Sequence, residues 1–148
     1  MEYQIQSSSV EETIETGRRL GSQLRGGEII ALVGHLGSGK THFVKGVAAG
    51  AGSPDAGRVS SPTFVIVNEY HGRLDIYHID AYRIDTAQQW ASIGFEDYCN
   101  PDSVVLVEWA DRVADYMGGA ASIEIRMQAV SETQRHITIS GEADYIKL

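Results

Sequence analysis

The chain has 148 residues, of which 43% are hydrophobic and 22% charged, a composition typical of a folded globular protein and not of a disordered chain. Its length predicts a single domain over residues 1–148. The net charge of −8 argues against non-specific binding to nucleic acid, because such binding relies on clustered Lys and Arg.

The chain also lacks the features of an exported or membrane protein. No apolar run approaches the roughly 20 residues that span a bilayer. The opening residues, MEYQIQSSSVEE, have neither the basic nor the apolar part of a secretory signal. The single cysteine, Cys99, excludes an internal disulfide and fits a reducing compartment. We therefore expect a cytoplasmic protein.

The first half of the chain predicts a helix, a buried strand and a second helix. Ser9 and Glu12 have the spacing of a capping box, and a helix is expected from there to about Leu24. Residues 28–33 form an apolar run of strand length, as expected for a central strand covered on both faces. A glycine-rich turn follows, and then a helix from residue 39 or 40 to about Ala49.

The second half predicts further strands with short helices between them. Residues 63–70 and 74–79 are β-rich runs joined by a short turn, which indicates a hairpin. Residues 87–98 are expected to be helical with an interruption at Gly94, and 109–116 to form a short helix. The run SVVLV at 103–107 predicts a second buried strand. Residues 122–129 and 136–140 alternate as antiparallel strands do.

The turn between the first buried strand and the next helix carries the strongest motif. Residues 34–41, GHLGSGKT, match the pattern G-x-x-x-x-G-K-[ST] in full, in the strand–turn–helix context that the motif needs. Its glycines let the backbone bring N–H groups to phosphate oxygens, and the helix directs its positive end at the same anion. Lys40 supplies a cation for the β- and γ-phosphates, and the Thr41 hydroxyl is a Mg²⁺ ligand in this arrangement. The sequence therefore predicts an α/β fold of the P-loop NTPase type, a three-layer sandwich with a mostly parallel central sheet and an antiparallel extension.

Two acidic residues follow strands and are candidates to complete such a site. Glu108 follows SVVLV and Asp80 ends LDIYHI, so both are expected at the carboxyl edge of the sheet, where open α/β sheets place ligands. There they would hold Mg²⁺ and orient an attacking water. A turn residue or helix cap is the simpler alternative for each. The segment Ser61-Pro62-Thr63 occupies the place of a switch, although a proline turn accounts for it equally well.

Two features bear on the ligand. The N-K-x-D motif, with which GTPases usually recognise guanine, does not occur in the chain, and its absence favours ATP over GTP. His35 and His42 flank the core of the loop, but no third ligand lies at a spacing that indicates a metal site, so loop residues are the simpler interpretation.

Four segments in order resemble the TsaE family, also called YjeE: GHLGSGKTHF at 34–43, VSSPTFVIVNEY at 59–70, YHIDAYR at 77–83 and VVLVEWAD at 104–111. The resemblance extends to Glu12-Thr13 and to the late strand RHITISG. It implies slow ATP hydrolysis and a role in threonylcarbamoyladenosine modification of transfer RNA beside the anticodon. It also implies docking on a complex of TsaB and TsaD, whose cycle the ATPase resets.

Carried over residue by residue, the resemblance assigns roles at the site. It implies Lys40, Glu108 and Asp80 as catalytic residues and Thr41, Glu108 and Asp80 as Mg²⁺ ligands. Two positions depart from the family: it usually has Asp where His35 stands and a second hydroxyl residue where His42 stands. The residues expected to contact nucleotide are Thr13, Gly34, Leu36, Gly37, Ser38, Gly39, Lys40, Thr41, His42, Thr63 and Trp109.

Two other functions fit a P-loop with strand-end acids. A small-molecule kinase is one, although 148 residues leave little room for the lid and substrate pocket that such enzymes add. A module that binds nucleotide without hydrolysing it is the other. Nucleotide turnover in the absence of any small acceptor favours the ATPase over the kinase. Single-turnover ATP hydrolysis by wild type and Glu108→Ala, with and without the partner complex, separates the ATPase from the module.

Overall fold

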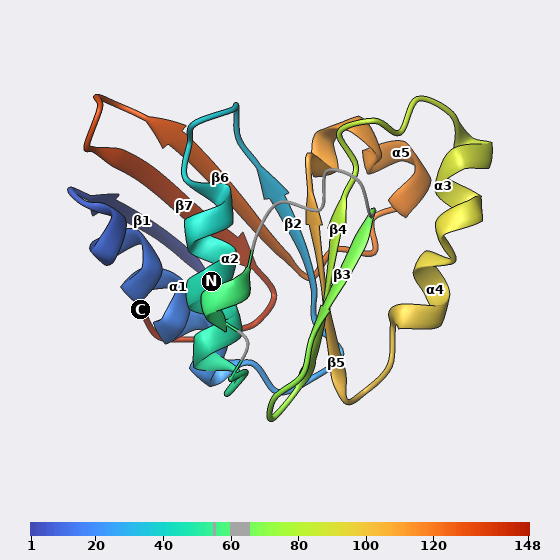
Figure 1. Cartoon of the computed structure of the whole chain (residues 1–148), viewed down its shortest axis with the longest axis horizontal. Helices are drawn as coiled ribbons and strands as arrows, with labels where there is room; N and C mark the ends of the chain where they lie inside the picture. The colour runs from blue at the N-terminus through green and yellow to red at the C-terminus, as the bar shows by residue number, and fades with distance from the viewer. Residues whose placement is uncertain (55, 60–65) are drawn as a thin grey trace.

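The fold is a mixed α/β arrangement built on one twisted sheet. The computed structural model describes residues 1–54, 56–59 and 66–148, and its strands follow the order β1-β7-β6-β2-β5-β4-β3 (Figure 1). The central strands β6, β2, β5 and β4 pair in parallel, whereas β1–β7, β7–β6 and β3–β4 are antiparallel. The predicted mixed sheet, mostly parallel in its middle, is thus confirmed. The strand bounds are β1 Glu2–Ser7, β2 Ile29–Val33, β3 Val67–Tyr70, β4 Asp75–Asp80, β5 Ser103–Glu108, β6 Ile123–Ala129 and β7 Arg135–Gly141.

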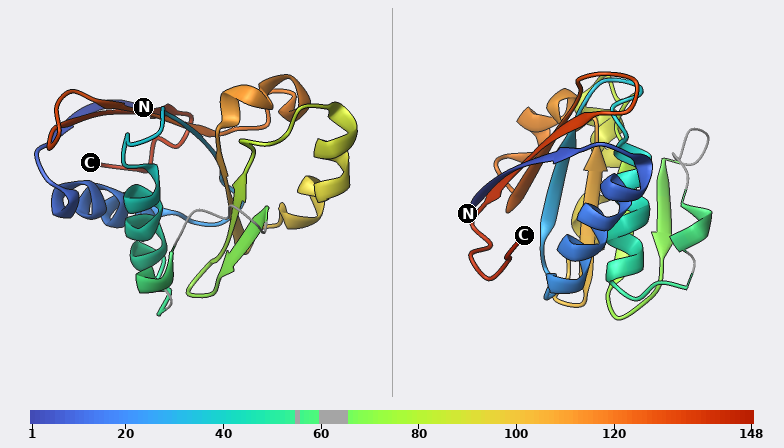
Figure 2. Two further views of the ribbon diagram at one scale, coloured as in Figure 1. Left: turned by 45° about the horizontal axis from the view of Figure 1, so that its top comes forward. Right: turned by 90° about the vertical axis from the view of Figure 1, so that its left-hand side faces the viewer.

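Helices lie on both sides of this sheet. In Figure 2 the twisted sheet separates α1 and α2 from α3, α4 and α5. The interruption expected at Gly94 is real: Gly94 has a left-handed φ of 75° and divides α3 from α4. The helix expected over 109–116 is instead a 3₁₀ turn followed by one short helix. The bounds are α1 Val10–Gln23, α2 Lys40–Gly50, η1 Ala56–Arg58, α3 Ala87–Ile93, α4 Phe95–Tyr98, η2 Ala110–Arg112 and α5 Ala114–Met117. Within the described ranges, no helix has the length and apolar character needed to cross a membrane.

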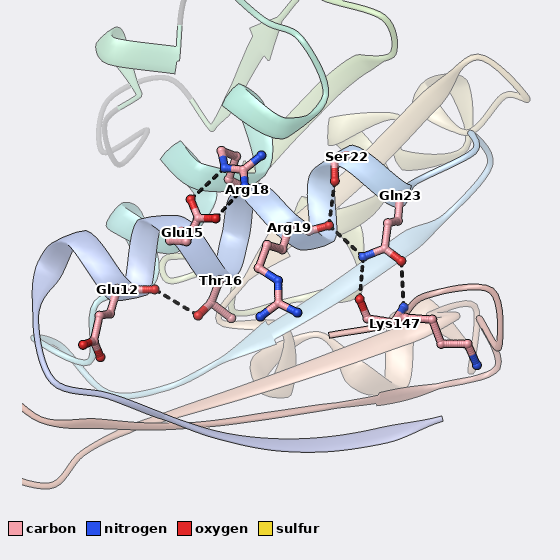
Figure 3. A network of polar contacts seen from close by, with 8 residues as sticks. All are labelled: Glu12, Glu15, Thr16, Arg18, Arg19, Ser22, Gln23 and Lys147. Carbon is pink, nitrogen blue, oxygen red and sulfur yellow. Dashed lines mark hydrogen bonds and ion pairs between the residues drawn. The ribbon is translucent and has the colours of Figure 1, made fainter.

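Helix α1 begins as the sequence predicts, with one difference in its cap. The Ser9 hydroxyl accepts a hydrogen bond from the Glu12 N–H at 3.1 Å, but the Glu12 carboxylate reaches back to the N–H of Ser8 and not of Ser9. At its other end, the Gln23 amide exchanges two hydrogen bonds with the backbone of Lys147 (Figure 3). These bonds attach the C-terminal segment to the end of α1.

The first strand was missed by the sequence analysis, which placed no element before Ser9. In the structure, β1 pairs along its whole length with β7, from Glu2 opposite Ser140 to Ser7 opposite Arg135. Its side chains alternate between exposed and partly buried positions. The alternation is short and mostly polar, and the partner strand lies more than a hundred residues away, so local pattern alone gives little indication of it.

The core lies on both faces of the central strands. Alternate residues of β5 enter opposite clusters: Leu106 packs with α1 and α2, whereas Val107 packs with the side chains of α3 and α4. All six residues of β5 are buried. The near-continuous apolar runs at β2 and β5 therefore have the expected cause, since parallel strands covered on both faces need apolar side chains in both directions.

Helices α1 and α2 approach each other through glycines. A Cβ at Gly17 or Gly21 would lie 2.3 or 2.2 Å from carbonyl oxygens of α2, and one at Gly46 would lie 2.0 Å from the carbonyl oxygen of Ile14. Ordinary van der Waals contact begins near 3.4 Å, so these positions accept no side chain at this spacing. The glycines therefore set how close α1 lies to α2.

The strand directions bring distant segments to one edge of the sheet. Strands β1, β6, β2, β5 and β4 run the same way, so their carboxyl ends meet at the same edge. The segments that leave this edge are the start of α1, the β6–β7 turn, the glycine-rich loop and the residues after β5 and β4. This edge is where open α/β sheets bind ligands.

Candidate nucleotide site

The loop between β2 and α2 is shaped by glycines. Gly37 and Gly39 have left-handed φ values of 78° and 95°, which only glycine adopts at little cost. A Cβ at Gly34 would lie 2.6 Å from the Ser38 Oγ and 2.7 Å from the Met127 carbonyl oxygen. The loop therefore folds tightly against β6 and places the start of α2, with its unpaired N–H groups, at the carboxyl edge of the sheet.

Lys40, the first residue of α2, turns its ammonium group back into this loop. Its Nζ donates to the carbonyl oxygens of Gly34 and His35, the latter at 2.9 Å, and the side chain is 7% exposed. Burial lowers the Lys40 pKa from its ordinary value, and the nearby carboxylates of Glu108, Asp80 and Asp111 oppose this shift. The result is a desolvated cation that the loop carbonyls hold in place.

Glu108 and Asp80 lie side by side at the ends of β5 and β4, where they are register partners. Glu108 is 2% exposed, and its Oε2 lies 3.0 Å from the Nε2 of the buried His78. Asp80 is partly exposed and accepts a hydrogen bond from the Tyr82 N–H at 2.9 Å. The two acids therefore stand at the edge to which the sequence assigned them, with Asp80 also serving in part as a turn cap.

Trp109 follows Glu108 with an unusual backbone. Its φ of 58° makes it the one non-glycine residue with a positive φ in the part of the chain that the structure describes. This conformation costs on the order of 1–3 kcal/mol and persists where surrounding contacts enforce it. The indole ring lies 4.3 Å from the Lys40 Nζ and 4.9 Å from the ring of Tyr82. The strained backbone thus presents an aromatic face to the buried cation.

A hollow of about 390 Å³ opens over these groups. It is lined by residues 36–42 together with Glu108 and Trp109, and by Val10 and Arg135 on its other side. A second hollow of about 280 Å³ adjoins it, lined by the start of α1, including Thr13, and by Glu132 and Thr133 of the β6–β7 turn. Val10, Gly39, His42 and Arg135 line both. Together they form a continuous surface from the loop to α1.

The structure brings most of the predicted site residues to this surface. Thr13 is buried beneath the second hollow, with its hydroxyl 2.7 Å from that of Ser7, so its side chain is already partnered. Gly34 and His35 line neither of the two hollows, and both line a separate hollow with His136. Ser61, Pro62 and Thr63 fall outside the described residues. The roles assigned to all of these residues stay predictions.

Two neighbours of the site were not predicted. Arg135, the first residue of β7, lines both hollows, and its Nη1 donates to backbone carbonyl oxygens of the β6–β7 turn, including those of Ser131 and Gln134. Val10 reaches the same surface from α1 and is 46% exposed. No local sequence pattern indicates Val10 or Arg135, because they reach the site through the strand order, which brings the ends of β1 and β6 beside the loop.

The oxygen donors at this surface suit a hard divalent cation. Across residues 1–54, 56–59 and 66–148, no three His, Cys, Asp or Glu side chains gather in a way that could hold a metal by themselves. Mg²⁺ commonly takes only one or two protein ligands and completes its shell with water and phosphate oxygens. The Thr41 hydroxyl and the Glu108 carboxylate line the larger hollow, whereas Asp80 lies beside Glu108 and lines neither hollow. The oxygens of these three residues are compatible with that mode.

Comparisons with known proteins agree on one family. The family model for "Threonylcarbamoyl adenosine biosynthesis protein TsaE" matches residues 7–137. A protein named "tRNA threonylcarbamoyladenosine biosynthesis protein TsaE" from Treponema pallidum is 34% identical over 134 residues, covering 90% of this chain and 97% of the relative. One with the same name from Bacillus subtilis is 34% identical over 132 residues, covering 88% and 80%.

The fold comparison gives the same result. The crystal structure of YdiB from Bacillus subtilis superimposes with a TM-score of 0.76 at 26% sequence identity, over 99% of this chain and 89% of that one. The family match covers both the glycine-rich loop and the strands that end beside it. The chain therefore belongs to the TsaE family of threonylcarbamoyl adenosine biosynthesis proteins.

Proposed function

We propose that this chain is a Mg²⁺-dependent P-loop ATPase that serves threonylcarbamoyladenosine modification of transfer RNA. The observation that carries the proposal is the 390 Å³ hollow at the start of α2, where the glycine-rich loop, Lys40, Thr41 and Glu108 converge. A cation, a helix N-terminus and a buried acid around one hollow suit a phosphate chain with an associated metal ion.

Lys40 is the group that would change partners when nucleotide binds. In the structure its ammonium donates to the carbonyl oxygens of Gly34 and His35 and packs against the Trp109 ring. Phosphate oxygens offer charge-assisted hydrogen bonds, which are stronger than bonds to neutral carbonyls. Binding would therefore draw Nζ away from the loop while the N–H groups of the loop and of α2 receive the same anion.

The acids would act on the metal and on water. When bound, Mg²⁺ neutralises part of the charge on the β- and γ-phosphates. Thr41, Glu108 and Asp80 are the residues that would hold it, directly or through water. We propose that Glu108, which lines the hollow and is 2% exposed, would also orient an attacking water and hold its proton.

The base and ribose would occupy the adjoining hollow. It lies between the first turn of α1 and the β6–β7 turn, and shares Gly39 and His42 with the phosphate hollow. Its volume of about 280 Å³ is of the order needed for an adenine ring with part of its sugar. Since the chain has no N-K-x-D string, ATP is the proposed nucleotide.

The biological role follows from the family. Its members are named for transfer RNA threonylcarbamoyladenosine biosynthesis. We propose that this chain acts by docking on a complex of TsaB and TsaD and not by binding transfer RNA itself. The net charge of −8 supports a protein partner, because it disfavours contact with a phosphate backbone.

The enzymatic proposal is tested by single-turnover hydrolysis of Mg-ATP without any small acceptor. Lys40→Ala and Thr41→Ala are expected to abolish turnover while circular dichroism and thermal unfolding stay as in the wild type. Lys45→Ala is the matched control, because Lys45 lies on the same helix and lines neither hollow. Unchanged turnover in both site variants would refute the assignment, and a strict need for a small acceptor would favour a kinase.

The partner proposal needs a separate experiment. We expect co-purification with TsaB and TsaD to depend on ATP, and transfer RNA from cells carrying the Lys40→Ala variant to lack the modification. Association that is absent, or equal with and without nucleotide, would contradict docking coupled to the ATPase cycle.

A further inference from the structure

Glu108, the acid buried at the proposed site, lies against a buried histidine. His78 lies on β4 two residues before Asp80, is 0% exposed, and places its Nε2 3.0 Å from the Glu108 Oε2. The ring's other nitrogen, Nδ1, lies 3.2 Å from the hydroxyl oxygen of Tyr70 on β3. Three strands thus contribute one polar side chain each to a row within the sheet face that α2 covers.

We propose that His78 is a positioning residue, oriented by Tyr70, that holds the Glu108 carboxylate in place for ATP hydrolysis. The inference rests on the proposed function. The His78 Nε2 would fix the direction of the Glu108 carboxylate, and the Tyr70 hydroxyl would fix the orientation of the His78 ring.

The burial of the pair is the first argument. A carboxylate that is 2% exposed is costly unless polar groups compensate it, and Glu108 makes no hydrogen bond through its side chain among the described residues. Lys40 attracts it from the loop side, but the Lys40 Nζ is bonded to loop carbonyls. Among the described residues, the His78 Nε2, 3.0 Å from the Glu108 Oε2, is therefore the polar group able to fix the direction of the carboxylate.

The geometry of the contact is the second argument. Although Nε2 and Oε2 lie 3.0 Å apart, they are not aligned for a hydrogen bond, and the His78 Nε2 has no aligned partner within the described residues. A buried nitrogen left unpaired next to an acceptor is costly unless a small rotation completes the bond. Catalytic hydrogen bonds are often poorly aligned before the substrate binds and tighten in the complex.

The strand register explains why this position is a histidine. His78 lies opposite Leu106, and Asp80 lies opposite Glu108. His78 is therefore two residues before Asp80 on β4, and its side chain points to the same face of the sheet as the side chain of Glu108. A leucine would fill the space but could not donate to Glu108. A glutamine carries an amide N–H about as far from its Cα as the Nε2 of histidine and could replace the contact in part.

The test compares His78→Leu, His78→Gln and the control Ile76→Val. Ile76 lies on the same strand and is fully buried in the same core, but it does not touch Glu108. For His78→Leu we expect kcat to fall roughly 10- to 100-fold, as is typical when a contact that orients a site ligand is lost, with KM for ATP within about twofold of wild type. The Mg²⁺ concentration for half-maximal turnover should rise, His78→Gln should regain most of kcat, and Ile76→Val should behave as wild type.

A binding measurement gives a readout that does not need turnover. Calorimetry with a non-hydrolysable ATP analogue should show an affinity within about twofold of wild type for His78→Leu at saturating Mg²⁺, but a higher Mg²⁺ concentration needed to reach that affinity. If His78→Leu fails to fold, Tyr70→Phe takes its place, with an expected fall in kcat of roughly threefold or more and unchanged KM.

The outcomes separate this inference from the proposed function. A folded His78→Leu, or in its absence Tyr70→Phe, with wild-type kcat and Mg²⁺ dependence overturns the positioning role while ATP turnover stands. Equal losses in His78→Leu and His78→Gln also overturn it, because the ring's shape and not its N–H would then matter. Wild-type protein that neither turns over nor binds Mg-ATP contradicts the proposed function itself and with it this inference.

Discussion

The contact between α1 and α2 can be tested by adding a single methyl group. Gly46→Ala would place a Cβ 2.0 Å from the carbonyl oxygen of Ile14, where ordinary contact begins near 3.4 Å. The two helices would have to move apart by roughly 1 Å, and overpacking of this kind costs about 3 kcal/mol at the upper end of its usual range. Alanine offsets about 1 kcal/mol of this through its better helix propensity. We expect a net loss of about 2 kcal/mol.

The assay is urea unfolding followed by far-UV circular dichroism. The urea concentration at the unfolding midpoint should be lower for Gly46→Ala, and the slope m of the unfolding free energy against urea should be unchanged. This combination is expected when a substitution changes stability without changing the surface that unfolding exposes. Gly57→Ala is the matched control, because a Cβ there meets no described residue within 4 Å and the backbone is not left-handed. The control should stay within about 0.5 kcal/mol of wild type. A Gly46→Ala protein as stable as the control would refute the close-packing argument.

Two further predictions concern a terminal hydrogen bond and the cation on β7. The Tyr145 hydroxyl donates to the Glu28 carboxylate at 2.6 Å, and burial together with Glu28 raises the Tyr145 pKa to about 12. Because the folded-state pKa exceeds the unfolded value of about 10, this stabilisation is present below pH 10 and lost as the pH rises towards 12. Chemical unfolding should therefore show wild type more stable than Tyr145→Phe at neutral pH, with the difference shrinking over that window; a constant difference would contradict it. Arg135→Gln should weaken binding of a fluorescent ATP analogue by roughly 10- to 100-fold, since a charge-assisted bond is worth about 1.5–3 kcal/mol. Arg126→Gln, outside both hollows, should leave the affinity unchanged; equal affinities in the two variants would remove Arg135 from the site.

The parts of the fold that the sequence predicted well are those specified by neighbouring residues. The glycine-rich loop between a buried strand and a helix is local, and its glycines at 37 and 39 have the left-handed conformations that the turn requires. Glu108 and Asp80 were placed at strand ends by the apolar runs before them. Parallel register then brings the two acids side by side without any further signal in the sequence.

The parts that escaped prediction depend on pairing between distant segments. Strand β1 takes its place from β7, and Arg135 reaches the site because β1 and β6 end at the same edge as β2. Gly17 and Gly21 form the contact surface of α1 for α2, and this role depends on how the two helices pack. The sequence analysis assigned no role to His78, because its contact with Glu108 arises only when β4 lies in register with β5.

The central claim, that the loop after β2 binds Mg-ATP through Lys40, is tested most directly by calorimetric titration of Mg-ATP into wild type, Lys40→Ala and Lys45→Ala. The account predicts one site per chain in wild type and in Lys45→Ala, and a loss of at least roughly 100-fold in affinity in a folded Lys40→Ala, corresponding to about 2.7 kcal/mol. Equal affinity in wild type and Lys40→Ala, or no binding by wild type, would contradict it.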